Sequence, residues 1–162
     1  MKLSKKGEYA LRALIDLATA DLVGRRLLRV SEIAQKEKMS VKFLEQVMLQ
    51  LREAGYVSSE RGKFGGYRLA RPAAKISLGQ VVRLIDGPLA PIGCVSQTAY
   101  TPCSCPDETH CGLRMVMLDV RNAIANILDR YTLANVVEVT TRKMRRDGIP
   151  LPFAPEPVTE KV

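Results

Sequence analysis

Two short helices followed at once by a glycine-rich hairpin constrain this chain more than any other part of its sequence. Ser31 can begin a helix over SEIAQKEK, and Ser40 is a good N-cap for the next helix, VKFLEQVMLQLREA, which Gly55 can end. The stretch YVSSERGKFGGYRLA then reads as two short strands around a flexible tip. We therefore predict a winged helix-turn-helix within residues 1–86 of a mostly α-helical chain with a small β-hairpin wing.

The charge of the chain is concentrated in the same half. Residues 1–86 contain 17 basic and 9 acidic side chains, whereas residues 87–162 contain 8 of each, and the whole chain carries +8. Because phosphate neutralisation releases counterions, a basic domain joined to a neutral module is typical of a DNA-binding protein. A solvated basic face without a polyanion would give the same count, so charge alone leaves both interpretations open.

The start of the second helix of the pair carries the side chains that could read DNA. Glu45 can accept a hydrogen bond from a cytosine amino group, Gln46 can pair with adenine, and Lys42 suits a phosphate. At the hairpin tip, Arg61 and Lys63 suit phosphates or the minor groove. The predicted DNA-binding residues are Ser40, Lys42, Phe43, Glu45, Gln46, Arg61 and Lys63.

The four cysteines gather in one loop, with the spacing C-x8-C-x-C-x5-C: Cys94, Cys103, Cys105 and Cys111. Buried structural thiols are usually scattered, so this grouping indicates metal ligation or redox chemistry. Structural zinc sites favour close C-x2-4-C pairs, and the wider spacing here favours an iron–sulfur cluster. Zinc and a metal-free thiol switch remain alternatives. His110 precedes Cys111 directly, and adjacent residues seldom face one metal.

A long helix follows the cysteine loop. Apolar residues recur over 111–131 at alternating spacings of four and three, at Leu113, Met117, Val120, Ile124, Ile127 and Tyr131. This period of 3.5 is typical of a helix that packs along a partner helix, so we expect a homodimer. The predicted organisation is a DNA-binding domain over 1–86, a cluster-binding loop over 87–111, dimerisation helices over 111–146 and a disordered or loosely docked, proline-rich tail over 147–162.

Three stretches carry a family resemblance: GEYALRALIDLA, SEIAQKEKMSVKFLEQVMLQLREAGYVSSERGKFGGYRLA and VRNAIANILDRYTLANVVE. Together they resemble the iron–sulfur-sensing winged-helix transcriptional regulators of bacteria, the IscR/NsrR class. The resemblance implies homodimers that bind palindromic promoter DNA and hold a [2Fe–2S] or [4Fe–4S] cluster, whose state alters DNA affinity. The family pattern has three cysteines, matched by Cys94, Cys105 and Cys111, which leaves Cys103 as an addition. The fourth ligand is then Cys103, His110 or Glu8, the last by analogy with relatives that use an acidic residue of the first helix.

The sequence also sets expectations about what the protein is not. The N-terminal apolar run is interrupted by Arg12 and Asp16, too early for a secretion signal or a membrane span, so we expect a cytoplasmic protein. No nucleophile–base pair is visible, and we expect no enzyme activity. An electron carrier with an incidental basic domain is a competing class, as is a regulator that senses something other than a cluster.

Overall fold

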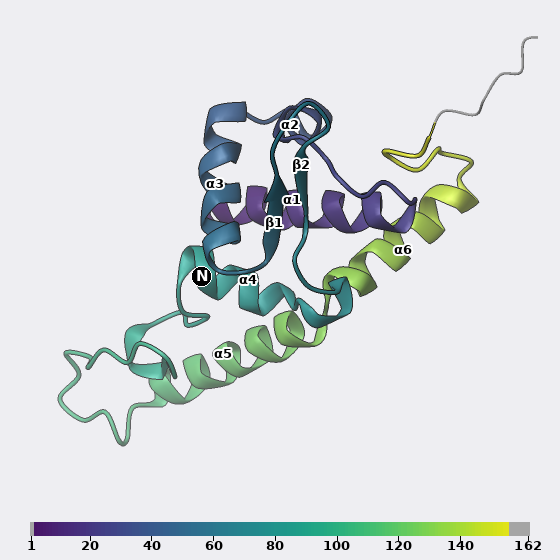
Figure 1. Ribbon diagram of the computed structural model, residues 1–162. Helices are drawn as coiled ribbons and strands as arrows, with labels where there is room; N and C mark the ends of the chain where they lie inside the picture. The colour runs from purple at the N-terminus through teal and green to yellow at the C-terminus, as the bar shows by residue number, and fades with distance from the viewer. Residues whose placement is uncertain (1, 156–162) are drawn as a thin grey trace, which may run out of the picture.

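The N-terminal half is assembled on α1 (Lys5–Leu22), a helix that begins where the Ser4 hydroxyl accepts a hydrogen bond from the Gly7 amide at 2.9 Å. The computed structural model describes residues 2–155 (Figure 1). One side of α1 is buried, and its four alanines face the helices that follow together with Leu14 and Leu17.

The helix-turn-helix consists of α2 (Val30–Glu37) and α3 (Val41–Glu53). The structure corrects the start of α2: Arg29, not Ser31, precedes the first turn, and the Glu32 side chain accepts from the Arg29 amide at 2.8 Å. Ser40 caps α3 as predicted. The buried stripe of α3 consists of Leu44, Val47, Met48 and Leu51. This stripe fixes which face of α3 stays outside.

The wing is an antiparallel hairpin of β1 (Val57–Glu60) and β2 (Gly66–Leu69). Leu28 joins the hairpin through an isolated bridge to Tyr67, a contact that no local sequence pattern predicts. The Leu28 amide donates to the Tyr67 carbonyl at 3.0 Å, and the Tyr67 amide donates to the Leu28 carbonyl at 2.7 Å. A Cβ at Gly66 would lie 2.6 Å from the Leu28 oxygen, so this close approach requires glycine.

The second half of the chain runs beneath the first and then rises beside the C-terminal end of α1 (Figure 1). After η1 (Ala73–Lys75), α4 (Leu78–Asp86) packs against α1, and α5 (Gly112–Arg130) packs against α4. A bidentate pair joins α4 to α5, with Arg83 Nη1 and Nη2 at 2.5 and 2.8 Å from the Asp129 carboxylate. Helix α6 (Leu133–Arg146) then returns along α1.

The described part of the C-terminal segment is attached to the domain by one aromatic ring. Phe153 packs against the core, and the Lys36 ammonium of α2 lies 5.8 Å from the centre of its ring. Burial of an aromatic ring and contact with a cation both favour this docked arrangement. The prediction for 156–162 lies outside the described residues.

Candidate nucleic-acid interface and cysteine loop

The exposed face of α3 carries most of the side chains predicted to read DNA. Lys42, Glu45 and Gln46 are exposed on the side opposite the buried stripe, and Ser40 is exposed at the cap. Phe43 differs from this group because it is half-buried, with its ring edge-on to Tyr9 of α1 at a centroid distance of 5.5 Å. The structure therefore gives Phe43 a packing contact that holds α3 against α1.

The wing tip presents two cations and one aromatic ring. Arg61 and Lys63 are exposed, as predicted. Phe64 is 83% exposed, more than any other large apolar side chain in the described part of the chain, and the Lys63 ammonium lies 5.6 Å from its ring centre. This ring was not among the predicted DNA-binding residues, although an aromatic residue between the wing glycines can be recognised in the sequence. An apolar side chain in this position has the form of a minor-groove wedge.

Two further arginines lie between the helix-turn-helix and the wing. Arg29 donates to the Lys63 carbonyl, and Arg52 donates to the Ser59 hydroxyl at 3.4 Å. With Arg61, they line a depression of about 370 Å³. Three guanidinium groups around one hollow suit a phosphate, because each presents several donors to its oxygens. Only the fold brings these three residues together, since they come from three separate elements.

An ion-pair network anchors α2 on α1. The Arg12 side chain lies 2.5 Å from the Glu37 carboxylate, and Lys36 Nζ donates to Asp16 Oδ1 at 2.6 Å. Asp16 is 2% exposed, and this burial raises the pKa of its carboxyl group to about 6, against the opposing effect of Lys36. Because α2 packs against α3, these pairs help to fix the position of α3 on α1.

The cysteine loop brings the four thiols into one neighbourhood. Cys94 is buried in η2 (Gly93–Val95), Cys103 is half-buried, Cys105 is exposed, and Cys111 is the N-cap of α5. The thiols of Cys103 and Cys111 raise the pKa of Cys105 to about 11. Burial, followed by the influence of Cys103 and Glu108, raises the pKa of Cys94. Neighbouring thiols resist ionisation together, and a bound cation would relieve that repulsion.

The chemistry of these donors therefore suits an iron–sulfur cluster, but the loop is not arranged as a finished site. Among residues 2–155, no group of three or more cysteine, histidine, aspartate or glutamate side chains is placed to hold a metal ion. Glu108, which sequence analysis overlooked, lies in the loop with its Oε2 3.9 Å from the Cys103 sulfur and 2.7 Å from the Tyr100 hydroxyl. No spacing rule for thiols would have singled it out.

The other two candidates for a fourth ligand are engaged elsewhere. His110 Nδ1 lies 2.6 Å from Asp107 Oδ2 on the surface of the loop, and this contact lowers the pKa of Asp107. Glu8 pairs with Lys5 at 2.9 Å and with Arg12 at 3.1 Å. Within one chain, neither side chain is directed into the group of thiols.

Helix α5 links the loop to the rest of the chain and leaves an apolar face open. Its Arg121 is buried, and Nε donates to the Val95 carbonyl beside Cys94 at 3.2 Å. Four residues of the predicted seam are exposed, Leu113 at 61%, Val120 at 39%, Ile127 at 53% and Tyr131 at 43%, whereas Met117 and Ile124 are half-buried. An apolar row of this length facing water marks an interaction surface.

Comparisons with known proteins agree with this architecture. The profile of the Rrf2 family, described as an iron-dependent transcriptional regulator, matches residues 3–139. The rrf2-like HTH-type transcriptional regulator of Rhodobacter capsulatus is 39% identical over 137 residues, which cover 83% of this chain and 91% of the relative. None of the helices in residues 2–155 has the length and apolar character to cross a membrane.

Two solved structures show the same fold. CymR, the global cysteine regulator of B. subtilis, superposes with a TM-score of 0.72 at 30% identity, covering 86% of this chain and 98% of that one. IscR of T. potens gives 0.69 at 29% identity, covering 88% and 90%. The expected winged-helix fold and the resemblance to IscR are thus confirmed, and the relatives are regulators rather than enzymes. The chain belongs to the Rrf2 family of DNA-binding transcriptional regulators.

Proposed function

We propose that this regulator is a cytoplasmic homodimer whose affinity for promoter DNA depends on an iron–sulfur cluster held by its cysteine loop. The observation that carries the proposal is the grouping of four thiols at the N-terminal end of a helix with an uncovered apolar face. The loop and the pairing surface thereby share one rigid element, α5, so a chemical change in the loop can alter how two protomers meet.

The DNA contacts follow from the exposed side of α3 and the wing. Glu45 and Gln46 read base edges in the major groove, while Lys42 and Arg61 contact phosphates. Lys63 and Phe64 approach the minor groove from the wing tip. In a twofold dimer, the two α3 helices contact half-sites roughly one helical turn apart, so a small change in their spacing alters affinity strongly.

Dimerisation uses the open face of α5. Leu113, Val120 and Ile127 recur along this face at intervals of seven residues and would lie against the same residues of a second copy. Covering several half-exposed apolar side chains provides the driving force, at about 25 cal/mol for each Å² removed from water.

Cys94, Cys103, Cys105 and Cys111 are the residues that would hold the cluster. When bound, the group supplies a centre that oxidants, nitric oxide or loss of iron can alter. The chain's own residues carry the consequence: Arg121 joins the loop to α5, Arg83 and Asp129 join α5 to α4, and the Ser4 amide joins α1 to the Asp86 carboxylate of α4 at 2.9 Å. Each link is a polar contact between elements on the route from the loop to α1.

A metal-free thiol switch or a structural zinc site is the second candidate. The loop lacks a preformed group of three donors among the described residues, and similarity to CymR makes a regulator without a cluster a specific alternative. Under this reading the same thiols would respond by oxidation or would hold zinc, and α5 would serve the same role.

The two candidates separate on protein purified without oxygen. Under the proposal, the dimer contains iron and acid-labile sulfide, absorbs in the visible range, and changes its Kd for its own promoter when the iron is removed. Cys105→Ala should lose the iron, whereas the neighbouring Ser104→Ala should keep it. Colourless protein with stoichiometric zinc, or promoter affinity that is identical with and without iron, would refute the cluster proposal.

Gln46→Ala tests the DNA contact separately. If Gln46 binds adenine with both polar groups, its loss should weaken operator binding by about 1–3 kcal/mol and leave binding to random DNA nearly unchanged. The exposed Gln35 of α2 offers a matched control, since Gln35→Ala removes the same side chain outside α3. Equal losses on both DNAs would assign Gln46 to the phosphate backbone.

A further inference from the structure

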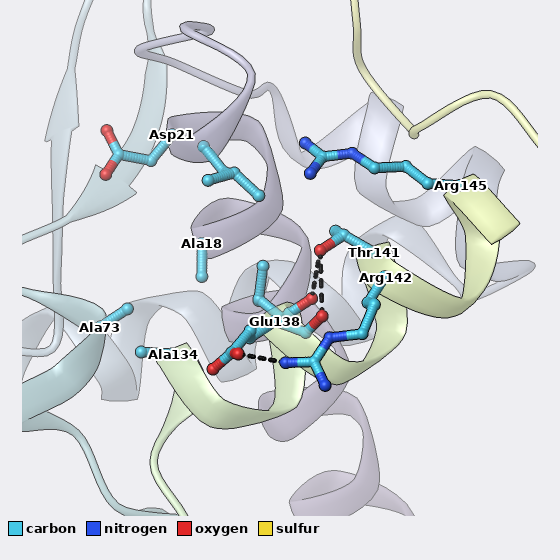
Figure 2. A pocket seen from close by; sticks show the side chains of 10 residues that line it. Ala18, Asp21, Ala73, Ala134, Glu138, Thr141, Arg142 and Arg145 are labelled. Carbon is cyan, nitrogen blue, oxygen red and sulfur yellow. Dashed lines mark hydrogen bonds and ion pairs between the residues drawn. The ribbon is translucent and has the colours of Figure 1, made fainter.

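A cavity of about 430 Å³ lies between the C-terminal half of α1, η1 and α6 (Figure 2). None of its lining residues belongs to α3, the wing or the cysteine loop, so the proposed function does not account for it. Pockets that take small molecules usually measure roughly 300–1,000 Å³. The size of this cavity therefore suits a small ligand.

The floor of the cavity is apolar and hollow because small residues meet there. Ala18 of α1, Ala73 of η1 and Ala134 of α6 contribute only methyl groups where larger side chains would normally interdigitate. Val137 closes the base, and Leu22 stands at the edge with 53% of its surface exposed. An apolar ligand body would cover this surface and displace water from it.

The polar rim contains two arginines, Arg142 and Arg145, of which only Arg145 has no ion-pair partner among residues 2–155. Arg142 pairs with Glu138, and the Thr141 hydroxyl donates to the Val137 carbonyl at 2.8 Å. Arg145 makes no ion pair with any residue between 2 and 155, and Figure 2 shows its side chain reaching across the upper rim. The carboxylate of Asp21 points away from it in the same view.

We infer that this cavity is a binding site for a small amphipathic monocarboxylate, with its hydrocarbon part on the alanine floor and its carboxylate on Arg145. A guanidinium group is suited to carboxylate, with which it forms charge-assisted hydrogen bonds. Such a ligand contacts α1 and α6 together and fixes the packing of α6 on the helix that supports the DNA-binding domain. An effect on DNA affinity rests on the proposed function, whereas binding itself does not.

Alanine methyl NMR tests the site directly, because Ala18, Ala73 and Ala134 line it. The probe is sodium hexanoate, titrated to about 20 mM because a ligand of this size binds in the millimolar range. Hexanol and hexylamine serve as neutral and cationic controls. We expect hexanoate to shift these three methyl signals in a saturable manner, hexanol to shift them more weakly, and hexylamine to leave them unchanged.

Two variants and one control variant assign the interactions. Arg145→Gln should weaken hexanoate binding about tenfold through loss of the charge-assisted contact, while Arg146→Gln, whose side chain pairs with Asp147, should bind as the parent does. Ala134→Leu should fill the cavity and abolish binding, although Arg145 is unchanged in this variant. The inference is overturned if hexylamine binds equally well, if Arg145→Gln keeps its affinity, or if the methyl signals respond only to protein concentration. DNA affinity measured with and without hexanoate then tests coupling to the proposed function separately.

Discussion

Asp16 should make the stability of the fold depend on pH. The side chain is almost completely buried under α2, with Oδ1 accepting from Lys36 Nζ at 2.6 Å and no hydrogen-bond partner for the buried Oδ2. Glu37 lies next to Lys36 and adds a second negative charge, while Arg12 compensates it from α1. Burial dominates this balance and favours the neutral carboxyl group.

The sign and size of the effect follow from the two pKa values of Asp16. The pKa is about 6 in the folded protein, compared with about 3.9 in an unfolded chain, a difference equivalent to about 3 kcal/mol. The folded state therefore binds the proton more tightly. Its stabilising contribution is complete below pH 4 and is lost as the pH rises through 6.

Asp16→Asn imitates the neutral carboxyl group at every pH. Relative to the parent, this variant should gain up to about 3 kcal/mol of unfolding free energy between pH 4 and pH 7. Urea unfolding at a fixed protein concentration measures the difference, since the proposed dimer would make stability concentration-dependent. Asp21→Asn, at an exposed position of the same helix, should show no such gain. Parallel pH profiles of Asp16→Asn and the parent would show that burial does not raise the pKa of the Asp16 carboxyl group.

Further predictions concern the DNA-binding surface and the proposed dimer surface. Phe64→Ala should reduce DNA bending, measured by fluorescence transfer between labelled DNA ends, without changing the salt dependence of binding. Arg61→Ala should instead lower the slope of log binding constant against log salt concentration by about 0.9, because one phosphate contact is lost. Ile127→Glu should weaken the dimer by at least about 2 kcal/mol in sedimentation equilibrium, and Asn126→Glu on the exposed polar side should not. Gly65→Ala should impair DNA binding more than it lowers Tm, because its Cβ would lie 2.2 Å from the Glu60 carbonyl at the wing.

Local signals accounted for most helix boundaries. Ser4, Ser40, Ser77 and Thr132 each cap a helix, and such a start is readable from the sequence because the hydroxyl accepts a hydrogen bond from an amide only three residues later. The apolar period of α5 also described a real surface, as the exposure of Leu113 and Ile127 shows. Features that depend on neighbours in the chain are therefore readable without a structure.

Features that depend on distant neighbours were missed. The edge-on contact of Phe43 with Tyr9 of α1 was not foreseen, because the two residues lie on separate helices. The ring of Phe153 was not singled out as the docking point of the proline-rich segment, because the Lys36 ammonium beside it is far away in the sequence. The cavity beside α6 forms only where alanines from three elements meet, which periodicity within one element does not encode.

The two hydrogen bonds between Leu28 and Tyr67 attach the hairpin to the segment that enters the helix-turn-helix. Backbone bonds of this kind do not depend on side-chain rotamers, so they tie the position of the wing to that of the helix-turn-helix. A change of shape within one DNA-binding domain is therefore an unfavourable route for regulating DNA affinity. In the proposed dimer, a signal can instead change the angle between the two DNA-binding domains, so DNA sites with altered half-site separation should reveal which state of the protein is present.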